Sequence, residues 1–288
     1  MQLFGIDFTS APRRAKAIVI AGARLEGERM VRVESLQRLT DFAAFEAFLA
    51  TPGPWIGAFD LPFGLPRELL AEWGWCAPQI GAPVVADAAH EDAPDWATIT
   101  RRLAAMSRET LIARLRAYCD ARPAGRKFAH RRTDGPAGSS PSMKWVNPPV
   151  ALMLHAGAPR LLAAGVHLPG LYPGGDPQRV ALEGYPGMVA RSLIGREPYK
   201  SDDKARQSAQ HRQARARILA ALHEQGWGGG PALQVDAPLH AQCLEDPTGD
   251  ALDALLCLVL AGWAWQRRDR RHGLPEDVDP LEGWVVGA

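Results

Sequence analysis

QLFGIDFTSAPRRAKAIVIAGARLEG (residues 2–27) opens the chain with two apolar runs on either side of a short polar connection. We expect residues 2–8 and 15–23 to form two strands and residues 30–36 (MVRVESL) to form a third, because turn-forming residues separate the three runs. The order predicts a three-stranded meander. One residue does not fit the pattern: Asp7 places a carboxylate inside the first apolar run, and a buried charge needs a compensating partner.

A helix and a fourth strand follow the meander. In residues 40–51 (TDFAAFEAFLAT) phenylalanines recur at helical spacing behind Thr40 or Asp41, either of which can cap the helix. Residues 55–66 (WIGAFDLPFGLP) are predicted as the fourth strand. Because a strand that returns to the same sheet through a helix lies parallel to the first strand, we expect a mixed α/β sheet. The ends of the first and fourth strands are then expected to lie close together.

The rest of the chain is predicted as a helical insertion followed by more sheet and helix. Residues 66–165 alternate helical stretches with loops rich in proline and glycine, and we interpret them as a largely helical insertion. Sheet character returns at residues 179–186 (RVALEGYP), and residues 282–287 (EGWVVG) are expected to form a short edge strand. Further helices are expected at residues 187–193, 201–226 and 250–268. We expect residues 1–288 to form a single domain with this insertion.

Composition and charge limit the class of protein. The 288 residues are 47% hydrophobic and 23% charged, which is typical of a globular protein with a substantial core. The formal net charge of +1 gives no overall attraction to nucleic acid or to membranes. Any surface that binds nucleic acid therefore has to be a local cluster of basic residues.

Cysteine usage and hydropathy favour a soluble, cytoplasmic protein. The four cysteines at positions 76, 119, 243 and 257 form no C-x-x-C pair and have no histidine at ligand spacing, so we expect reduced thiols rather than disulfides or a zinc site. The N-terminus has no signal-peptide pattern. The most apolar segment, Leu252 to Trp265, is too short to span a bilayer and contains Asp253, so no membrane association is expected.

Acidic residues recur in predicted strands. Asp7 has counterparts in Asp60, within the apolar run WIGAFD, and in Glu183, within VALE. Burying isolated carboxylates costs several kcal/mol per group, so three strands that each contain one favour a shared cation. Mg²⁺ or Mn²⁺ fits a ligand set made only of oxygen atoms.

A further acidic pair begins the last apolar helix. Asp250 and Asp253 in GDALDALL are spaced i, i+3, so both carboxylates can face the same way and complete a two-ion site. Structural alternatives stay open for each residue. Asp250 is a good N-cap, and Asp253 in the first turn interacts favourably with the helix dipole. Asp7 and Asp60 are also suited to closing the turns that follow their strands.

Several motifs in order along nearly the whole chain resemble one known family. They are GIDFTS (5–10), FDLPFGLP (59–66), EGYPGMVARSLIG (183–195), PYKS (198–201), DALDALL (250–256) and DPLEGWVVG (279–287). The sequence is similar to the family catalogued as domain of unknown function 429, whose members are predicted to be ribonuclease-H-like nucleases. The resemblance implies a ribonuclease-H-like mixed five-stranded sheet flanked by helices.

The resemblance also implies roles for the acids. In similar nucleases, acids on the first strand, the fourth strand and the last helix bind divalent metal, and these correspond to Asp7, Asp60 and Asp253, with Asp250 beside them. Glu183 matches an E-x-x-P segment of the family. The expected catalytic residues are therefore Asp7, Asp60, Glu183 and Asp253, and the expected ligands of Mg²⁺ or Mn²⁺ are Asp7, Asp60, Asp250 and Asp253.

The function expected from this pattern is metal-dependent hydrolysis of phosphodiester bonds in nucleic acid, DNA or RNA. Local basic clusters would contact the phosphates. They comprise Arg122, Arg126, Lys127, Arg131 and Arg132 in the insertion, Lys200, Lys204, Arg206, Arg212, Arg215 and Arg217 around the long helix, and Arg267 to Arg271 near the end. The expected substrate-binding residues are Thr9, Ser10, Arg126, Lys127, Lys200 and Lys204.

Two other functions remain open at this stage. GIDFTS also resembles the first phosphate loop of actin-like sugar kinases, in which Thr9 and Ser10 would donate to a nucleotide phosphate while Asp7 holds Mg²⁺. The sequence shows no second glycine-rich segment of the kind such kinases use late in the chain. The third possibility is a ribonuclease-H-like module without catalytic activity that binds nucleic acid or a protein.

Overall fold

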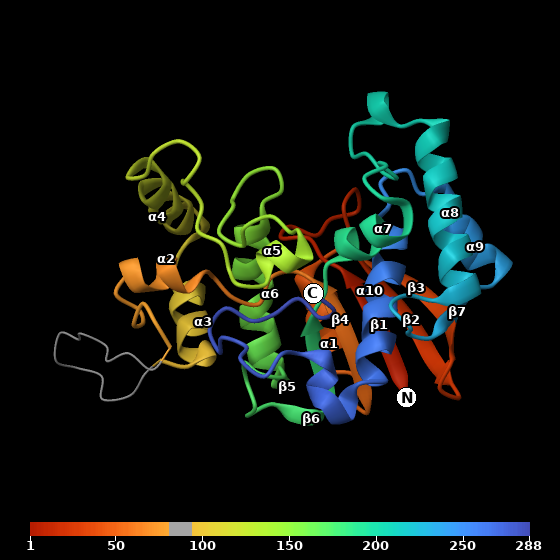
Figure 1. The fold of residues 1–288 in the computed structure, drawn as a ribbon, viewed down its shortest axis with the longest axis horizontal. Helices are drawn as coiled ribbons and strands as arrows, with labels where there is room; N and C mark the ends of the chain where they lie inside the picture. The colour runs from red at the N-terminus through yellow and green to blue at the C-terminus, as the bar shows by residue number, and fades with distance from the viewer. Residues whose placement is uncertain (81–93) are drawn as a thin grey trace.

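The sheet is mixed and has seven strands. The structure, a computed structural model, describes residues 1–80 and 94–288. The strands lie in the order β5-β6-β4-β1-β2-β3-β7 (Figure 1). Their bounds are β1 Gln2–Asp7, β2 Ile18–Glu26, β3 Met30–Leu39, β4 Trp55–Asp60, β5 Val166–His167, β6 Asp176–Glu183 and β7 Ala232–Gln234.

The directions of the strands agree with the order expected from the sequence. β2 pairs antiparallel with both β1 and β3, while β4 is parallel to β1 and β6 is parallel to β4. The expected number of five strands was wrong, because β5 and β7 extend the two edges of the sheet. Strands of two and three residues are too short to show a period of two in the sequence.

The expected C-terminal strand is reduced to one bridge. In the segment expected to be a strand at residues 282–287, only Val285 forms a bridge, which is parallel to Glu183 of β6. The amide of Val286 donates to the Glu183 carbonyl over 2.9 Å. This segment therefore lies beside the end of β6 without lengthening the sheet.

Helices cover both faces of the sheet. Their bounds are α1 Phe42–Leu49, α2 Arg67–Glu72, α3 Trp96–Ala104, α4 Arg108–Asp120, α5 Asp134–Ala137, α6 Val150–Ala164, α7 Pro186–Ile194, α8 Ala209–Gln225, α9 Ala237–Glu245 and α10 Asp250–Trp265. Short 3₁₀ turns occur at Lys204–Arg206 and Arg268–Gly273. One core contains residues of α1, α3, α4 and α6 with one face of the sheet, and the other contains residues of α7 to α10 with the opposite face.

The position of α10 depends on a glycine. α10 packs across β1, β2 and β4, and a side chain at Gly5 in β1 would overlap the backbone of Ala254 and Leu258 in α10. Glycine at this position therefore lets the helix approach the strand closely. The N-terminal turn of α10 consequently lies near the C-terminal ends of β1 and β4.

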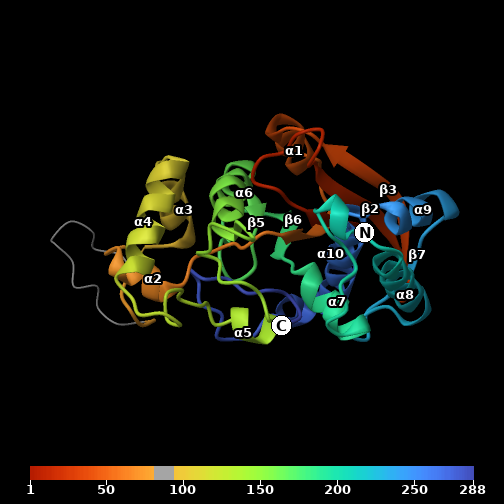
Figure 2. The ribbon, with the colours of Figure 1, turned by 90° about the horizontal axis from the view of Figure 1, so that it is seen from above.

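The segment expected to be a helical insertion contains α2 to α6 among its described residues. Residues 81–93, which belong to the same expected insertion, lie outside the described residues. α4 and α8 lie at opposite ends of the molecule (Figure 1 and Figure 2). The four cysteines are buried and free, as expected.

No single described helix is long and apolar enough to cross a membrane. α9 and α10 would be long and apolar enough only if they were taken together as one segment, and the chain bends by 118° between them.

Candidate metal centre

Two aspartates come together because their strands are parallel and in register. Asp7 ends β1 and Asp60 ends β4, and the two residues are partners in the ladder between the strands. Side chains alternate between the faces of a strand, so Asp7 lies on the same face as Gly5, and Asp60 lies on the same face as Ala58. This is the face that α10 covers.

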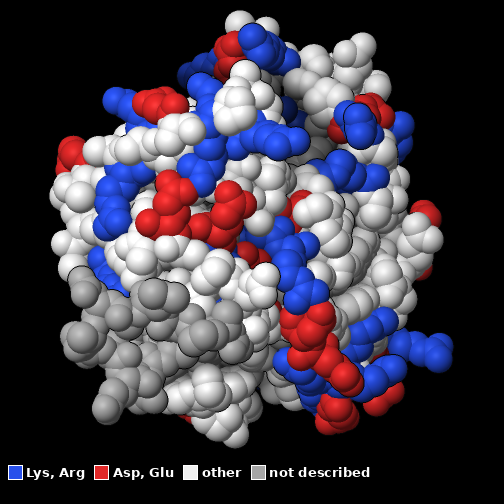
Figure 3. Space-filling model, turned by 60° about the vertical axis from the view of Figure 1, so that its left-hand side comes forward, with Lys and Arg blue, Asp and Glu red and all other residues white. Residues whose placement is uncertain are grey.

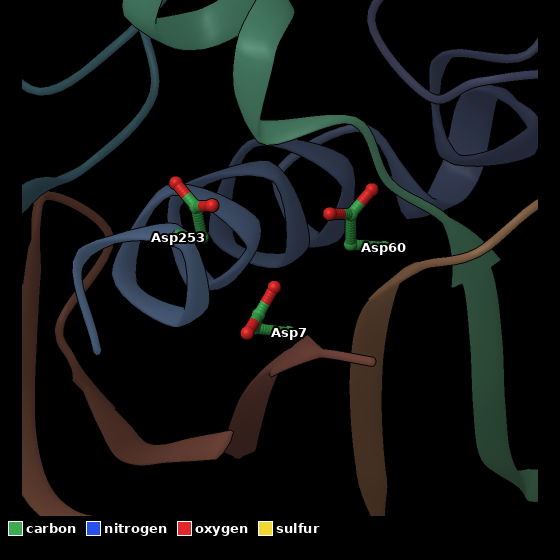
Figure 4. Close-up of side chains that lie close together, drawn as sticks. All are labelled: Asp7, Asp60 and Asp253. Atoms are coloured by element: carbon green, nitrogen blue, oxygen red, sulfur yellow. The ribbon is translucent and has the colours of Figure 1, made fainter. Parts of the chain in front are cut away.

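The third aspartate comes from α10. Asp253 lies in the first turn of this helix, which places its carboxylate beside the ends of β1 and β4. One carboxylate oxygen from each of Asp7, Asp60 and Asp253 lies within 4.8 Å of the others. Figure 4 shows the three side chains gathered at one place from these three elements. We call this group the aspartate cluster.

The aspartate cluster is largely buried, and the charges of its members repel one another. Asp7 is 7% exposed and Asp253 is 0% exposed, whereas Asp60 is partly exposed. Burial raises the pKa of Asp7 well above its usual range, and the charges of Asp253 and Asp250 add to the effect. Burial, with the charge of Asp253, raises the pKa of Asp60 to about 7. Burial also raises the pKa of Asp253. These shifts indicate that the cluster lacks sufficient positive charge.

Two side chains from one segment contact Asp253. The buried hydroxyl of Tyr199 donates to Oδ1 of Asp253 over 2.6 Å. The ammonium group of Lys200 forms an ion pair with Oδ2 of the same carboxylate. Sequence reasoning assigned Lys200 to the substrate and missed Tyr199 entirely. The motif PYKS contains both residues, but nothing in its spacing shows which neighbour they contact.

Asp250 lies beside the aspartate cluster without joining it. Nζ of Lys16 lies 2.7 Å from Oδ1 of Asp250, and Nη2 of Arg38 lies 3.7 Å from Oδ2. The N-cap role considered for Asp250 was wrong, because Gly249 is the N-cap of α10 and Asp250 is its first residue. The amide of Ala251 in the first turn donates instead to Oδ2 of Asp246 over 3.1 Å. Lys16, which lies in the connection between β1 and β2, thus neutralises Asp250 through its ion pair. The sequence pattern did not indicate this interaction.

Glu183 is not brought together with the aspartates. Glu183 is the ladder partner of Phe59, so it lies on the opposite face of the sheet from Asp60. Nη2 of Arg131 donates to its Oε1 over 2.6 Å, and the amide of Phe63 donates to its Oε2 over 2.9 Å. Arg131 also binds Asp134, and the three charged side chains are buried. Here Glu183 links β6 to the insertion.

The residues expected to bind substrate lie at three places. Thr9 and Ser10 follow Asp7 after one intervening residue, Phe8, and are partly exposed. Arg126 and Lys127 are exposed on the connection between α4 and α5, and Lys204 is exposed ahead of α8. Lys200 contacts the aspartate cluster, as described above. The basic groups near α4 and α8 therefore lie toward opposite ends of the molecule.

Many residues of the expected basic clusters are bonded within the protein. Arg131 and Arg215 are each 3% exposed, and Arg215 donates to the carbonyls of Leu244 and Tyr199. The exposed ion pairs are Arg122 with Glu72, Arg132 with Asp277, Arg206 with Asp203, Arg212 with Glu245 and Arg217 with Glu197. On the side of the molecule with the insertion, basic and acidic side chains are interleaved (Figure 3).

The aspartate cluster fits a hard divalent cation. Its donors are carboxylate oxygens close enough to share one ion, which is the ligand type that Mg²⁺ and Mn²⁺ bind in proteins. Burial and mutual repulsion together raise the pKa values of Asp7 and Asp60, and a cation between the three groups would offset both effects. Asp250 is outside the group of converging oxygen atoms and is paired with Lys16, so the arrangement favours one ion at this place.

The fold and the site define an α/β protein with a carboxylate cluster at the carboxyl ends of two parallel strands. A family model described as protein of unknown function (DUF429) matches residues 5–279, and the chain belongs to this family. No curated protein and no solved structure matches the chain.

Proposed function

We propose that this protein is a divalent-metal-dependent hydrolase of phosphodiester bonds that acts on nucleic acid. The observation that supports the proposal is the convergence of Asp7, Asp60 and Asp253 from β1, β4 and α10 into one cluster, in which Asp7 and Asp253 are buried. Buried carboxylates without sufficient opposite charge are costly. The presence of three such carboxylates at one place is explained if the cluster binds a cation.

The sheet order supports a ribonuclease-H-like fold. The central strands lie in the order β3-β2-β1-β4-β6, and β2 alone among them is reversed. A meander followed by parallel strands is the arrangement that the family resemblance implies. The family resemblance implies metal ligands on the first and fourth strands, and the proximity of Asp7 and Asp60 at the ends of β1 and β4 supports the proposal.

The residues of the chain have distinct roles in the proposed site. Asp7, Asp60 and Asp253 would hold the cation, and Tyr199 fixes the carboxylate of Asp253. When bound, Mg²⁺ or Mn²⁺ supplies Lewis-acid chemistry for phosphodiester hydrolysis. Thr9 and Ser10 offer hydroxyl donors beside the end of β1. The exposed side chains of Arg126, Lys127 and Lys204 would contact phosphates farther along a nucleic acid.

Calorimetric titration with Mn²⁺ tests the proposal directly. We expect saturable binding to the wild-type protein and at least a 100-fold weaker Kd for Asp7→Asn. Asp202→Asn is the matched control, because its side chain is 79% exposed, and it should bind Mn²⁺ as the wild type does. A panel of single- and double-stranded DNA and RNA, incubated with and without Mn²⁺, should show cleavage by the wild type and the control only.

Other outcomes would replace the proposal. Phosphate transfer from ATP, together with stabilisation by ATP and Mg²⁺, would support the actin-like phosphotransferase instead. Mn²⁺ binding with no cleavage of any nucleic acid would contradict the proposed substrate. If the wild type binds neither metal nor ATP, the protein is a module without this catalytic activity and the cluster is structural.

A further inference from the structure

The segment 198–201 contacts both oxygen atoms of Asp253. The Tyr199 hydroxyl donates to Oδ1 over 2.6 Å, and the Lys200 ammonium group pairs with Oδ2. Neither Asp7 nor Asp60 forms an ion pair with a basic residue in the described parts of the chain. Lys200 is therefore the only basic residue that forms an ion pair with the aspartate cluster, within residues 1–80 and 94–288.

The fold holds this segment in place from three directions. Nη1 of the buried Arg215 donates to the Tyr199 carbonyl over 2.7 Å, and the Ser201 amide donates to the Pro247 carbonyl over 3.1 Å. At Gly249, the residue before α10, a side chain would approach Cβ and Cδ of Lys200 to 2.8 Å. The glycine thus leaves space for the Lys200 side chain to cross the start of the helix.

The two donors differ in their freedom to move. Tyr199 is 8% exposed, so its hydroxyl has little alternative to Asp253. The side chain of Lys200 is 41% exposed, whereas that of Asp253 is fully buried. Because the Lys200 side chain borders solvent, rotation about its side-chain bonds would carry the ammonium group away from Asp253 toward water.

We propose that Lys200 is the resident counter-cation of the aspartate cluster. It pairs with Oδ2 of Asp253 when no metal is bound and releases that oxygen when a divalent cation enters, while Tyr199 keeps the carboxylate oriented. The released ammonium group would then be free to donate to a substrate phosphate. This inference rests on the proposed metal site and is independent of whether the protein cleaves nucleic acid.

Lys200→Gln tests the proposal, since it keeps a polar side chain and removes the charge. In metal-free protein at pH 8, we expect its unfolding temperature to fall by about 5 °C or more, because Asp253 loses its ion pair. In calorimetry, we expect Mn²⁺ to bind about tenfold more tightly, because no ammonium group competes for Asp253. Lys200→Arg should stay within about threefold of the wild-type Kd.

Arg196→Gln is the control, since Arg196 is exposed four residues away, and neither quantity should change. If Mn²⁺ binds Lys200→Gln with an unchanged or weaker Kd, competition is refuted. An unchanged unfolding temperature without metal refutes the counter-cation role. If the wild type binds no Mn²⁺, the proposed function fails, while the metal-free unfolding temperature still tests the ion pair. Should Lys200→Gln not fold without metal, refolding with Mn²⁺ must recover it, and failure to do so contradicts the proposal.

Discussion

Acids at strand ends separate into two groups according to the face on which they lie. Asp7 and Asp60 face α10, whereas Glu183 faces the insertion, because it aligns with Phe59 instead of Asp60. The sequence indicates that all three acids lie at strand ends, and the resemblance adds Asp253. It does not reveal the register between β4 and β6, and a shift of one residue moves a side chain to the other face. The expected grouping of Glu183 with the aspartates was therefore wrong, and its separation from them was not predictable from the sequence.

Asp250 and Asp253, three residues apart in α10, allow the same substitution to be compared inside and outside the aspartate cluster. We expect Asp253→Asn to weaken Mn²⁺ binding at least 100-fold, because it removes a member of the aspartate cluster. Asp250→Asn should weaken it by about tenfold or less, since Lys16 and Arg38 already neutralise that carboxylate. Calorimetric titration of both variants measures the difference. Equal losses would contradict the assignment of Asp250 outside the cluster.

The raised pKa of Asp60 predicts that the stability of the metal-free protein depends on pH. Burial and the charge of Asp253 raise its pKa to about 7 in the fold, whereas an unfolded aspartate titrates near 4. Between these values the folded state binds the extra proton, so stability falls as pH rises. Asp60→Asn cannot lose this proton, so its free energy of unfolding should change less with pH. We expect the difference in the free energy of unfolding between Asp60→Asn and the wild type to shift in favour of the variant by about 1 to 3 kcal/mol from pH 5 to pH 8. Urea unfolding in EDTA measures this difference at each pH. A difference that stays constant from pH 5 to pH 8 would refute the effect of the Asp60 charge on stability.

At the scale of elements, the strands and most helices follow from sequence periodicity and caps. Asp41 caps α1, as one of the two expected caps. The helix expected at residues 201–226 is instead divided, because Ser208 caps α8 by accepting from the amide of His211. A serine before a helical pattern is a start signal for a helix. The residues ahead of Ser208 are polar and show no strand or turn pattern, so the sequence did not indicate that the helix begins only after this serine. The close contact of α10 with β1 depends on Gly5, whose role is visible only once the helix is placed.

Gly5→Ala should therefore destabilise the protein strongly. Its new Cβ would overlap backbone atoms of α10, which cannot move without displacing Asp253. We expect a loss of about 3 kcal/mol in the free energy of unfolding. Gly135→Ala is the control, since its new methyl group meets open space, and it should change stability by about 0.5 kcal/mol or less. Urea unfolding of the two variants compares them, and similar stabilities would contradict the packing described for α10.

β6 is joined to the insertion through Glu183 and Arg131. Glu183→Gln removes one charge of this buried pair, and we expect it to cost about 3 kcal/mol of stability. Mn²⁺ binding should remain within about threefold of the wild-type Kd, because Glu183 lies on the other face of the sheet. Glu34→Gln, which changes an exposed residue of β3, serves as the control. A large loss of Mn²⁺ affinity in folded Glu183→Gln would place Glu183 in the site.

At the scale of the whole molecule, one sheet separates two cores, and the insertion enlarges only one of them. The sequence predicted the mixed sheet and the largely helical segment, because both depend on local patterns. It did not predict the two short edge strands, nor that many basic residues would pair with acids. Those contacts join residues far apart in the chain, so their partners are set by the tertiary fold. The proposed nucleic-acid surface therefore depends on the basic residues that stay exposed, such as Arg126, Lys127 and Lys204.

A crystal structure grown with Mn²⁺, with anomalous scattering recorded at the manganese edge, tests the central claim most directly. We expect one strong anomalous peak within coordination distance of Asp7, Asp60 and Asp253, with the Lys200 ammonium group displaced from Oδ2 of Asp253. No peak at the aspartate cluster in crystals soaked at saturating Mn²⁺, with Lys200 still paired to Asp253, would contradict the proposal that these residues form a metal centre.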